Sequence, residues 1–227
     1  YATSNAYTVL CQPYKLEIAS SLGVAPESSR IYAIENPEQP VETVNYEKEK
    51  VVLFCGRFEN WSKRIDRLLR IWARVEPLLA DWKLVLVGDG RDGKMLRGLA
   101  EDLKLQRVSF EGMQKNVSEY YRKASVVCLT SETEGWPLAL TEGQAQGCIG
   151  VAFGATSGIK EILDGGCGFT VTAFDEAEFA QTLIKLASLD EDRIMEMRMN
   201  GVRKRAEYAP EAIADKWKKL FDMLVMQ

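Results

Sequence analysis

The sequence predicts an α/β protein with one parallel β-sheet that is covered by helices on both faces. The main observation is that short apolar runs alternate with segments of helical periodicity from Val51 onward, an order typical of such sheets. A second observation is that most of the runs end in glycine or a polar loop, and ligands of these folds bind at the carboxyl ends of the strands. A third is that the residues after Val171 show helical periodicity alone.

The expected strands and helices follow one another in alternation. The strands are residues 51–56, 83–88, 107–112, 125–130, 148–153 and 168–171. The helices between them are residues 64–79, 94–103, 118–124, 137–146 and 158–163. Ahead of this unit, residues 8–23 predict a strand and a helix closed by Gly23, residues 30–37 a further strand, and residues 38–50 a linker or surface loop.

Large apolar residues indicate which faces become buried. Phe179, Leu183 and Leu186 share one helical face, and Ile213, Trp217, Leu220, Phe221 and Leu224 share another. The aromatic residues expected to pack in the core or against helix faces are Trp61, Trp72, Trp82, Tyr120 and Tyr121.

Composition excludes several classes of function. The 227 residues carry a net charge of −4 without a basic run, which argues against nucleic acid as a partner. The chain has no histidine, so a Ser-His-Asp triad, a Cys-His pair and a His-ligated metal are excluded. Five scattered cysteines without CxxC spacing predict reduced thiols rather than disulfides or zinc. No apolar stretch approaches the ~20 residues of a membrane helix.

The stretch VLVGDGRDGKML has the glycine spacing of a dinucleotide-binding turn, at Gly88, Gly90 and Gly93. Two features speak against that function. The fingerprint normally follows the first strand of its unit, whereas this one follows the second. Asp89 would also put a carboxylate beside the pyrophosphate. We therefore interpret the match as accidental and keep an NAD-binding domain as a remote alternative.

Two glutamates, Glu134 and Glu142, stand with seven residues between them. Pro137 suits a first helical position, which leaves Glu134 in the preceding loop and Glu142 about one and a half turns into the helix. The N–H groups of Leu138 and Ala139 would then face a phosphate above the helix end, and a carboxylate in the first turns can accept two hydrogen bonds from a ribose diol. The alternative is that both glutamates simply favour the positive end of the helix dipole.

Two cations lie near the end of the first strand of the unit. Gly56 ends that strand, Arg57 follows it, and Lys63 precedes the next helix. A diphosphate is well bound by such a pair, because arginine offers a fork of donors and lysine a point charge. The alternative is a solvated loop with ordinary surface charges.

Together these stretches resemble the retaining glycosyltransferases of family 4. The resemblance rests on GRF-x4-K, VLVGDG, V-x-F-x-G, EGWPL-x3-E and SGIKEIL-x-GG-x-GF-x-V, and it extends from Ile31 to about Leu189. Members of that family have the GT-B fold, in which two Rossmann-like domains face each other across a cleft. The resemblance implies that residues 29–227 form the carboxyl-terminal, nucleotide-sugar-binding domain with a helical tail, and that residues 1–28 are a remnant of the acceptor domain or a linker.

The resemblance also implies a role for each matching residue. Arg57 and Lys63 would hold the diphosphate and neutralise the leaving group, Glu134 would contact the donor sugar, and Glu142 would bind the ribose hydroxyls. The other donor-binding positions are Gly56, Gly88, Gly112, Met113, Gly135, Trp136, Pro137, Leu138 and Ala139, with the backbone near Gly112 and Met113 meeting the base. Trp136 stands where phenylalanine is commoner, and Pro137 where glycine or proline occurs. No metal or other cofactor is required.

The implied function is transfer of a hexose-type sugar from a nucleoside-diphosphate sugar, with uridine as the expected base, to a glycan or lipid-linked acceptor in polysaccharide biosynthesis. The implied location is cytoplasmic, with peripheral association with the inner membrane face where the acceptor is a lipid. The amino-terminal acceptor domain, which usually carries a histidine, is missing. Because the last helix of GT-B proteins crosses back onto that domain, part of the apolar face from Ile213 to Leu224 is expected to be exposed. A non-catalytic or epimerase-type sugar-nucleotide-binding domain remains the main alternative.

Overall fold

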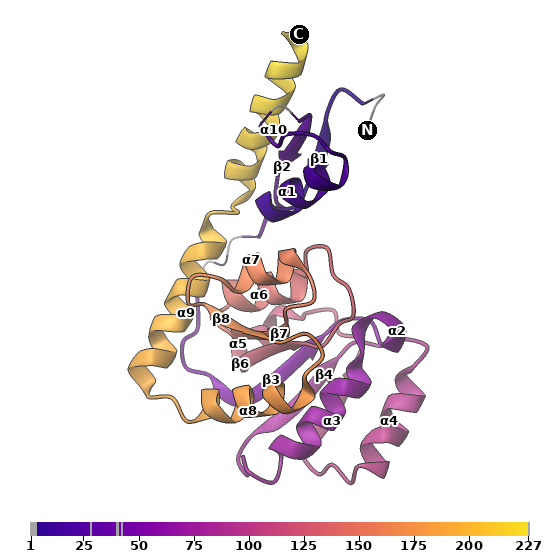
Figure 1. Cartoon of the computed structure of the whole chain (residues 1–227). Helices are drawn as coiled ribbons and strands as arrows, with labels where there is room; N and C mark the ends of the chain where they lie inside the picture. Colours follow the sequence, from indigo (N-terminus) through magenta and orange to yellow (C-terminus); the bar gives the residue numbers. More distant parts are fainter. Residues whose placement is uncertain (1–3, 28, 40, 42, 227) are drawn as a thin grey trace.

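The main body of the protein is a parallel sheet with a helical layer on each face (Figure 1). The computed structural model describes residues 4–27, 29–39, 41 and 43–226. Its six-stranded sheet has the order β5-β4-β3-β6-β7-β8, and every pair of neighbours is parallel. The strands are β3 (Glu49–Cys55), β4 (Lys83–Val87), β5 (Val108–Gly112), β6 (Ala124–Leu129), β7 (Ile149–Phe153) and β8 (Gly168–Val171).

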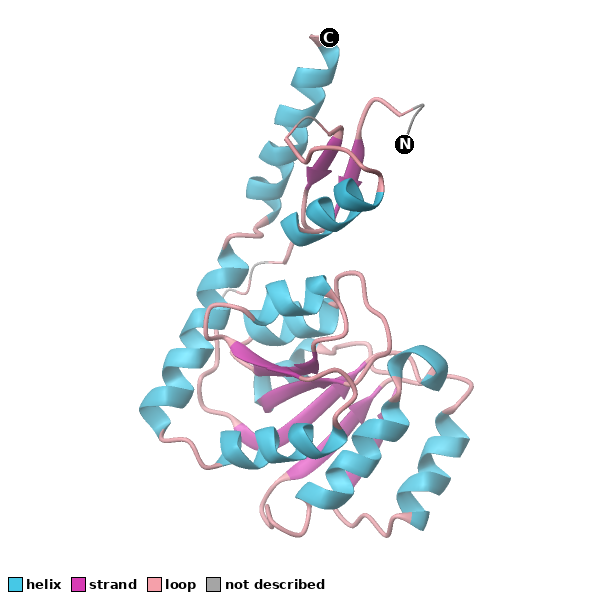
Figure 2. Ribbon diagram, viewed as in Figure 1, coloured by secondary structure: helices cyan, strands magenta, loops and turns pink. Residues whose placement is uncertain are grey.

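The helices divide between the two faces of this sheet (Figure 2). One apolar core lies between the sheet and α3 (Ile65–Val75), α4 (Gly93–Asp102) and α8 (Glu176–Ala187). The other lies between the sheet and α5 (Ser118–Lys123), α6 (Leu138–Ala145) and α7 (Ser157–Leu163). A short helix, α2 (Asn60–Lys63), precedes α3. The predicted Rossmann-like fold is therefore confirmed, and one detail is corrected: Pro137 is the N-cap of α6, which begins at Leu138.

A smaller region lies above this body in Figure 1 and contains both chain ends. Its parallel two-stranded sheet pairs β1 (Tyr7–Val9) with β2 (Ile31–Ala33), and α1 (Gln12–Ser21) connects them. After α9 (Glu191–Ala206), α10 (Pro210–Val225) runs along this small sheet. The Tyr32 hydroxyl contacts the sulfur of Met223 at 3.8 Å, and Lys216 pairs with Glu35. The small sheet thus combines strands from both sides of the predicted boundary at residues 28 and 29.

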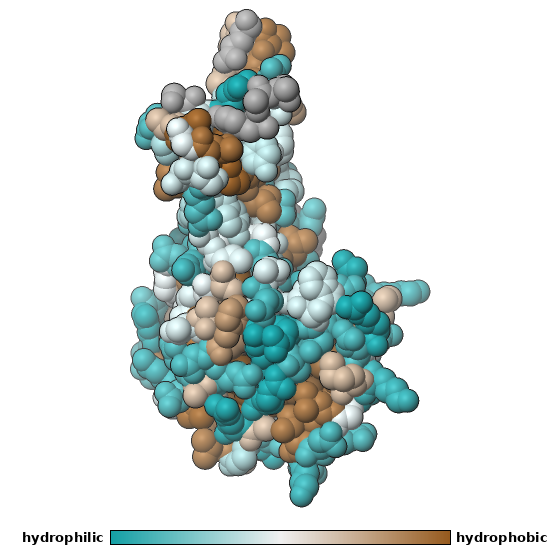
Figure 3. All heavy atoms as spheres, turned by 45° about the vertical axis from the view of Figure 1, so that its right-hand side comes forward, coloured by the Kyte–Doolittle hydropathy of each residue, from teal (hydrophilic) through white to brown (hydrophobic). Residues whose placement is uncertain are grey.

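Several apolar side chains of α10 are exposed. Ile213 and Leu220 are buried, whereas Phe221, Val225 and Met226 are exposed and the Trp217 ring stacks on Phe221 at 5.7 Å. Hydrophobic colour gathers near the top of Figure 3, over the end of α10 and the segment beside it.

The predicted packing of the aromatic residues holds for four of the five, since the half-buried Tyr120 packs against the core beside α5. Trp72, Trp82 and Tyr121 are buried, and Tyr120 is half-buried. The prediction was wrong for Trp61, whose side chain is 66% exposed because α2 is too short to offer a buried face. Within the described part of the chain, no helix is long and apolar enough to span a bilayer.

Candidate functional site

Three of the predicted glycines form a row at the carboxyl ends of neighbouring strands. The Gly56 N–H donates to the Val87 carbonyl at 3.0 Å, and the Gly88 N–H donates to the Gly112 carbonyl at 2.9 Å. Gly88 has a φ of +137°, and a Cβ there would lie 1.8 Å from the Gly56 carbonyl oxygen. Any side chain at position 88 would therefore push the ends of β3 and β4 apart.

The glycine-rich turn after β4 packs against the chain after β3. The Phe58 N–H donates to the Asp89 carbonyl at 2.9 Å, and the Asp92 carboxylate accepts from the Asn60 N–H at 2.6 Å. A Cβ at Gly90 would lie 2.7 Å from the Phe58 carbonyl oxygen. These glycines allow close backbone packing, which agrees with the interpretation that the dinucleotide spacing is accidental.

The structure brings two of the predicted catalytic residues into direct contact. The Lys63 ammonium lies 2.7 Å from Oε1 of Glu134, and the Ser131 hydroxyl donates to the same oxygen at 2.7 Å. The Glu134 side chain is 10% exposed and that of Lys63 28%. Because both groups are largely removed from water, this ion pair is stronger than an ordinary surface pair.

The loop that carries Glu134 is fastened to the turn that carries Lys63. The Glu132 N–H donates to the Ser62 carbonyl at 2.7 Å, and the Thr130 hydroxyl donates to the Arg64 carbonyl at 2.9 Å. Arg64 and Arg67 both pair with the Glu132 carboxylate, at 3.1 and 2.8 Å. These contacts fix the two loops against each other.

The turn between α2 and α3 is itself held by charged groups. Arg64 has a left-handed backbone with a φ of +49°, a conformation that is uncommon for a residue other than glycine. Its guanidinium holds the Asp66 carboxylate at 3.0 and 3.2 Å, and Arg70 pairs with Asp66 as well. Burial alone would raise the pKa of Asp66, but the two arginines outweigh it and hold this pKa at about 2.

The third predicted catalytic residue, Arg57, is more exposed. Its side chain is 80% exposed and, among the residues that the structure describes, pairs with the Glu59 carboxylate alone, at 3.4 Å. Arg57 lies on the loop after β3, so its guanidinium can turn toward an anion without breaking a strong contact.

The amino end of α6 presents backbone donors. Across the described residues, the N–H groups of Leu138 and Ala139 donate to no carbonyl, whereas that of Leu140 donates to Pro137 at 3.1 Å. The carbonyls of Glu134 and Gly135 accept from the Tyr14 hydroxyl of α1 at 3.1 and 3.0 Å. The predicted loop thus ends in free donors that face the carboxyl edge of the sheet.

The side chain of Trp136 lies under this loop. It is buried and meets the Tyr208 ring edge-on at 5.7 Å. The Arg205 guanidinium lies 4.6 Å from the centroid of the same Tyr208 ring. The indole therefore supports the loop from below.

Glu142 lies in a separate cavity of about 630 Å³ between α5, α6 and the segment before β3. Glu142 is half-buried, and burial raises its pKa. The neighbouring Tyr121 ring is buried, and its hydroxyl, shielded from solvent, makes no hydrogen bond of normal geometry with the described residues. It lies near Glu142 and lowers the pKa of that carboxyl, against the effect of burial. Cys55 and Glu38 also line the cavity. Burial, together with the charge of Glu142, raises the pKa of Glu38.

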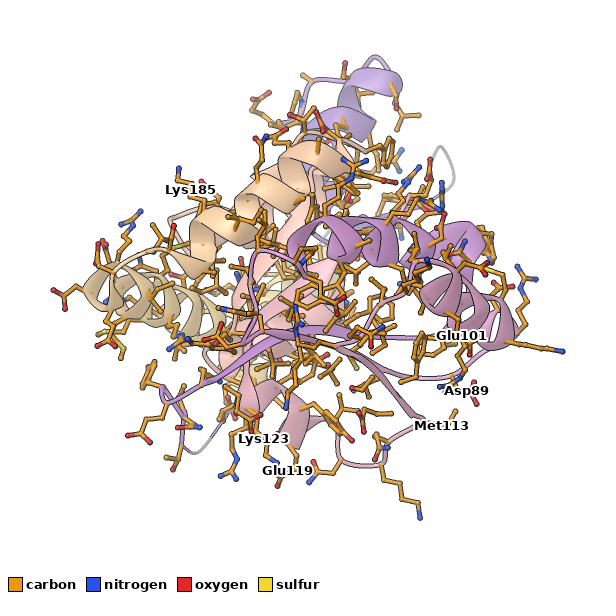
Figure 4. The ribbon with its side chains drawn as sticks, turned by 90° about the horizontal axis from the view of Figure 1, so that it is seen from below. Asp89, Glu101, Met113, Glu119, Lys123 and Lys185 are labelled. Atoms are coloured by element: carbon orange, nitrogen blue, oxygen red, sulfur yellow. The ribbon has the colours of Figure 1, made fainter. Side chains whose placement is uncertain are left out.

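The residues predicted to meet the base lie at the same end of the sheet. Gly112 ends β5 with a φ of +69°, and Met113 is 81% exposed. Figure 4 shows Met113 and Asp89 projecting from neighbouring loops, after β5 and β4. Glu119 and Lys123 lie farther away, on α5.

The structure therefore divides the predicted site into two parts. Lys63 and Glu134 form one part, which we call the ion-paired part, with Arg57 exposed on the loop before Lys63. Glu142 lines the cavity, to which those three residues do not contribute. Sequence reasoning missed Ser131, Tyr14 and the role of Tyr121 in the cavity. No group of His, Cys, Asp or Glu residues in the described ranges is arranged to hold a metal ion.

Fold and site define a doubly wound α/β domain whose candidate ligand site lies at the carboxyl ends of the strands. The comparison with protein families is more specific. The chain belongs to the family of group 1 glycosyl transferases, whose model matches residues 35–204.

Curated relatives agree with this assignment. The chain is 33% identical over 141 residues to an uncharacterized glycosyltransferase of Haemophilus influenzae, a match that covers 61% of this chain and 40% of the relative. It is 30% identical over 177 residues to an α-1,4-N-acetyl-D-galactosaminyltransferase of Campylobacter jejuni that is named for an undecaprenol-linked glycan, a match that covers 78% of this chain and 49% of the relative. The chain spans about half the length, or less, of these relatives.

Solved structures confirm the predicted fold as one half of a GT-B protein. A TarM mutant of S. aureus, in complex with UDP, superposes with a TM-score of 0.86 at 24% identity, over 97% of this chain and 44% of that protein. The Anabaena protein HepE, in complex with UDP and glucose, superposes with a TM-score of 0.77 at 19% identity, over 99% and 64%. The NAD-binding and epimerase-type alternatives are not favoured by these matches.

Proposed function

We propose that this chain is the donor-binding part of a retaining family 4 glycosyltransferase. Its substrate would be a nucleoside-diphosphate sugar, from which a hexose-type sugar is transferred to a glycan or lipid-linked acceptor. The observation that carries the proposal is the Lys63–Glu134 pair beside the free N–H groups at the start of α6. It combines a cation for a phosphate with a carboxylate for sugar hydroxyls.

The diphosphate would bind between Lys63, Arg57 and the amino end of α6. Lys63 supplies a fixed charge, Arg57 an exposed fork of donors, and Leu138 and Ala139 two backbone N–H groups. Negative charge grows on the leaving diphosphate as the glycosidic bond breaks. Donors that are already in place stabilise that charge without reorganisation. These fixed cations supply the stabilisation without a metal ion.

The sugar and the ribose would each meet a carboxylate. Oε1 of Glu134 is taken by Lys63 and Ser131, which leaves Oε2 to accept from a sugar hydroxyl. Glu142 would accept from the ribose hydroxyls in the cavity, beside the Tyr121 hydroxyl. The base would lie near the backbone of Gly112 and Met113. Uridine is favoured because TarM and HepE were solved with UDP.

The rest of the enzyme would supply the acceptor site. The two-stranded sheet has strands of three residues each, whereas parallel sheets are normally larger and covered on both faces. We infer that an amino-terminal domain extends this sheet and covers the exposed residues of α10. Relatives named for undecaprenol-linked and lipopolysaccharide acceptors support a glycan or lipid-linked acceptor, and with it a cytoplasmic location at the inner membrane face.

The first test is calorimetric titration of the chain with UDP, GDP, ADP and NAD in the presence of EDTA. The same titrations follow for Arg57→Ala, Glu142→Ala and, as a matched control, Lys94→Ala on the exposed side of α4. We expect one diphosphate to bind despite the chelator, to bind at least tenfold more weakly to the first two variants, and to bind normally to the control. Binding of NAD alone, or diphosphate binding that is independent of Arg57 and Glu142, would contradict the proposal.

A further inference from the structure

The carboxylate of Glu134 is occupied on one side only. Oε1 receives both the Lys63 ammonium and the Ser131 hydroxyl at 2.7 Å, whereas Oε2 accepts no hydrogen bond from the described residues. The Glu134 side chain is 10% exposed, and Oε2 is not among the side-chain atoms that are sealed from solvent, so this oxygen is open to a ligand. A neutral hydroxyl donor satisfies such an oxygen, whereas an anion is repelled by it.

We propose that Glu134 discriminates between an intact sugar nucleotide and a free nucleoside diphosphate, and that it disfavours the free diphosphate. The inference rests on the proposed function, since it assumes that a diphosphate binds at Lys63. It assigns Glu134 a role in specificity and product release in addition to contact with the sugar.

Charge distinguishes the two ligands. In a sugar nucleotide the outer phosphate is linked both to the inner phosphate and to the sugar, and it carries a single negative charge. In the free diphosphate it is a terminal phosphate, whose second pKa of about 6 gives it nearly one further charge at neutral pH. The additional charge resides on the phosphate nearest to Lys63 and therefore nearest to Glu134.

Competition between Glu134 and a phosphate for Lys63 also disfavours the free diphosphate. The ammonium already bonds to Glu134, so a phosphate must share this cation with a carboxylate. When the sugar is present, its hydroxyls can bond to Oε2 and offset the repulsion. When the sugar has left, Oε2 loses that donor and the repulsion remains.

Glu134 cannot easily swing away from the phosphate. Ser131 holds its carboxylate, and the Tyr14 hydroxyl holds its carbonyl at 3.1 Å. The bond from the Glu132 N–H to the Ser62 carbonyl fixes the same loop. The negative charge therefore stays beside Lys63 in both ligand states, as discrimination by charge requires.

The test compares the affinities of UDP and UDP-N-acetylglucosamine for the wild-type chain and for Glu134→Gln, by calorimetry at pH 7.5. UDP-glucose and UDP-galactose are measured in parallel, and the corresponding GDP or ADP pair is used if the first titrations select that base. We expect Glu134→Gln to bind the free diphosphate about tenfold more tightly and the sugar nucleotide no more tightly. At pH 5.5, where the outer phosphate of UDP gains a proton, the gain for UDP should shrink.

Two variants serve as controls. Glu132→Gln makes the same charge change two residues away, on a carboxylate that pairs with Arg64 and Arg67, and should change both affinities by the same factor. Ser131→Ala loosens Glu134 without removing its charge and should shift the ratio of the two affinities in the same direction as Glu134→Gln, by a smaller factor. It also provides a readout if Glu134→Gln fails to fold in thermal melts.

The outcomes separate the two proposals. If the wild-type chain binds neither ligand, the proposed function fails and this inference fails with it. If both ligands bind but Glu134→Gln and Ser131→Ala leave the ratio of their affinities unchanged, the discriminating role of Glu134 is overturned while the donor site stands.

Discussion

The two carboxylates of the candidate site lie in opposite electrostatic environments. Glu134 is paired with Lys63 and receives a hydrogen bond from Ser131. Glu142 lies in a cavity with Tyr121, Cys55 and a second carboxylate, Glu38, and burial raises its pKa. The protein therefore offsets the cost of burying charge more fully at Glu134, with a cation and a hydroxyl, than at Glu142, where the Tyr121 hydroxyl only partly opposes the effect of burial. Substitutions in the ion-paired part should affect stability and binding together, whereas those in the cavity should affect binding more.

The largest effect is expected from Lys63→Ala. This variant removes a phosphate-binding cation and leaves the Glu134 carboxylate buried without its partner. The affinity for a sugar nucleotide should fall about 100-fold, or ~2.7 kcal/mol, and the melting temperature should fall as well. Calorimetry and thermal melts measure both quantities.

A second variant separates the two effects of Lys63. The double variant Lys63→Ala/Glu134→Gln should recover stability but not affinity, because no charge is then left unpaired. Lys94→Ala, which alters an exposed lysine, serves as the charge control. An affinity for the sugar nucleotide within threefold of wild type in Lys63→Ala would remove Lys63 from the donor site.

Asp66→Asn should lower the free energy of unfolding, because Asp66 is held by Arg64 and Arg70 in the turn between α2 and α3. The pKa of Asp66 is held at about 2 against a usual 3.8, which corresponds to about 2 kcal/mol of unfolding free energy at neutral pH. Because this pKa is depressed, the contribution is present above about pH 4 and is lost as the pH falls toward 2. Urea unfolding at pH 7, 5 and 3 should show that wild type loses this contribution on acidification and that Asp66→Asn does not.

The control for Asp66 is an exposed ion pair. Asp81 pairs with Lys50 at the surface, so Asp81→Asn should leave the unfolding curve unchanged. Equal stabilities of wild type and Asp66→Asn at pH 7 would mean that the arginines around Asp66 contribute nothing net.

Binding at the cavity should depend on pH through Glu142. A ribose diol donates to the charged carboxylate, and burial raises the pKa of Glu142 above its usual 4.5. Affinity for UDP-N-acetylglucosamine, whose phosphates do not titrate in this range, should therefore fall as the pH is lowered from 8 toward 5 and Glu142 takes up a proton. Glu142→Gln should bind more weakly at pH 8 and show a flatter profile. A pH-independent wild type would argue against the ribose contact.

The smallest effect is expected from Tyr121→Phe. The buried Tyr121 hydroxyl makes no hydrogen bond of normal geometry with the described residues, so its removal should leave the melting temperature unchanged or slightly raised. The same hydroxyl lowers the pKa of Glu142, so its removal should raise that pKa, and affinity should fall about threefold, or ~0.6 kcal/mol. A lower melting temperature with unchanged affinity would identify the hydroxyl as a structural group.

Much of the fold follows from local sequence patterns. The apolar runs from Val51 to Val171 mark the six strands closely, because strands of a doubly covered parallel sheet are apolar on both faces. Trp61 departs from its expected burial because its burial depends on the length of α2 and not on hydrophobicity. The pairing of β1 with β2 and the position of α10 beside them depend on contacts between distant segments, which periodicity does not record.

The sequence identified the residues of the candidate site, but it predicted only part of their arrangement in space. Lys63 and Glu134 were both expected near the donor, but their ion pair joins positions 71 residues apart and has no local signature. Tyr121 was assigned to the core correctly, but its place in the lining of the cavity was not expected, since an aromatic residue can pack in the core and still border a polar site. The proposed roles of the donor residues remain predictions.

The bonds of Tyr14 have a mechanical consequence. Its hydroxyl, on the distant helix α1, donates to two successive carbonyls, those of Glu134 and Gly135. A Cβ at Gly158 of α7 would lie 2.2 Å from the Gly135 carbonyl oxygen and 3.0 Å from the Tyr14 hydroxyl, so α7 packs closely against the same contact. A displacement of α1 would therefore move the loop that carries Glu134 through the two hydrogen bonds of Tyr14. The position of Glu134 thus depends on the position of the amino-terminal segment.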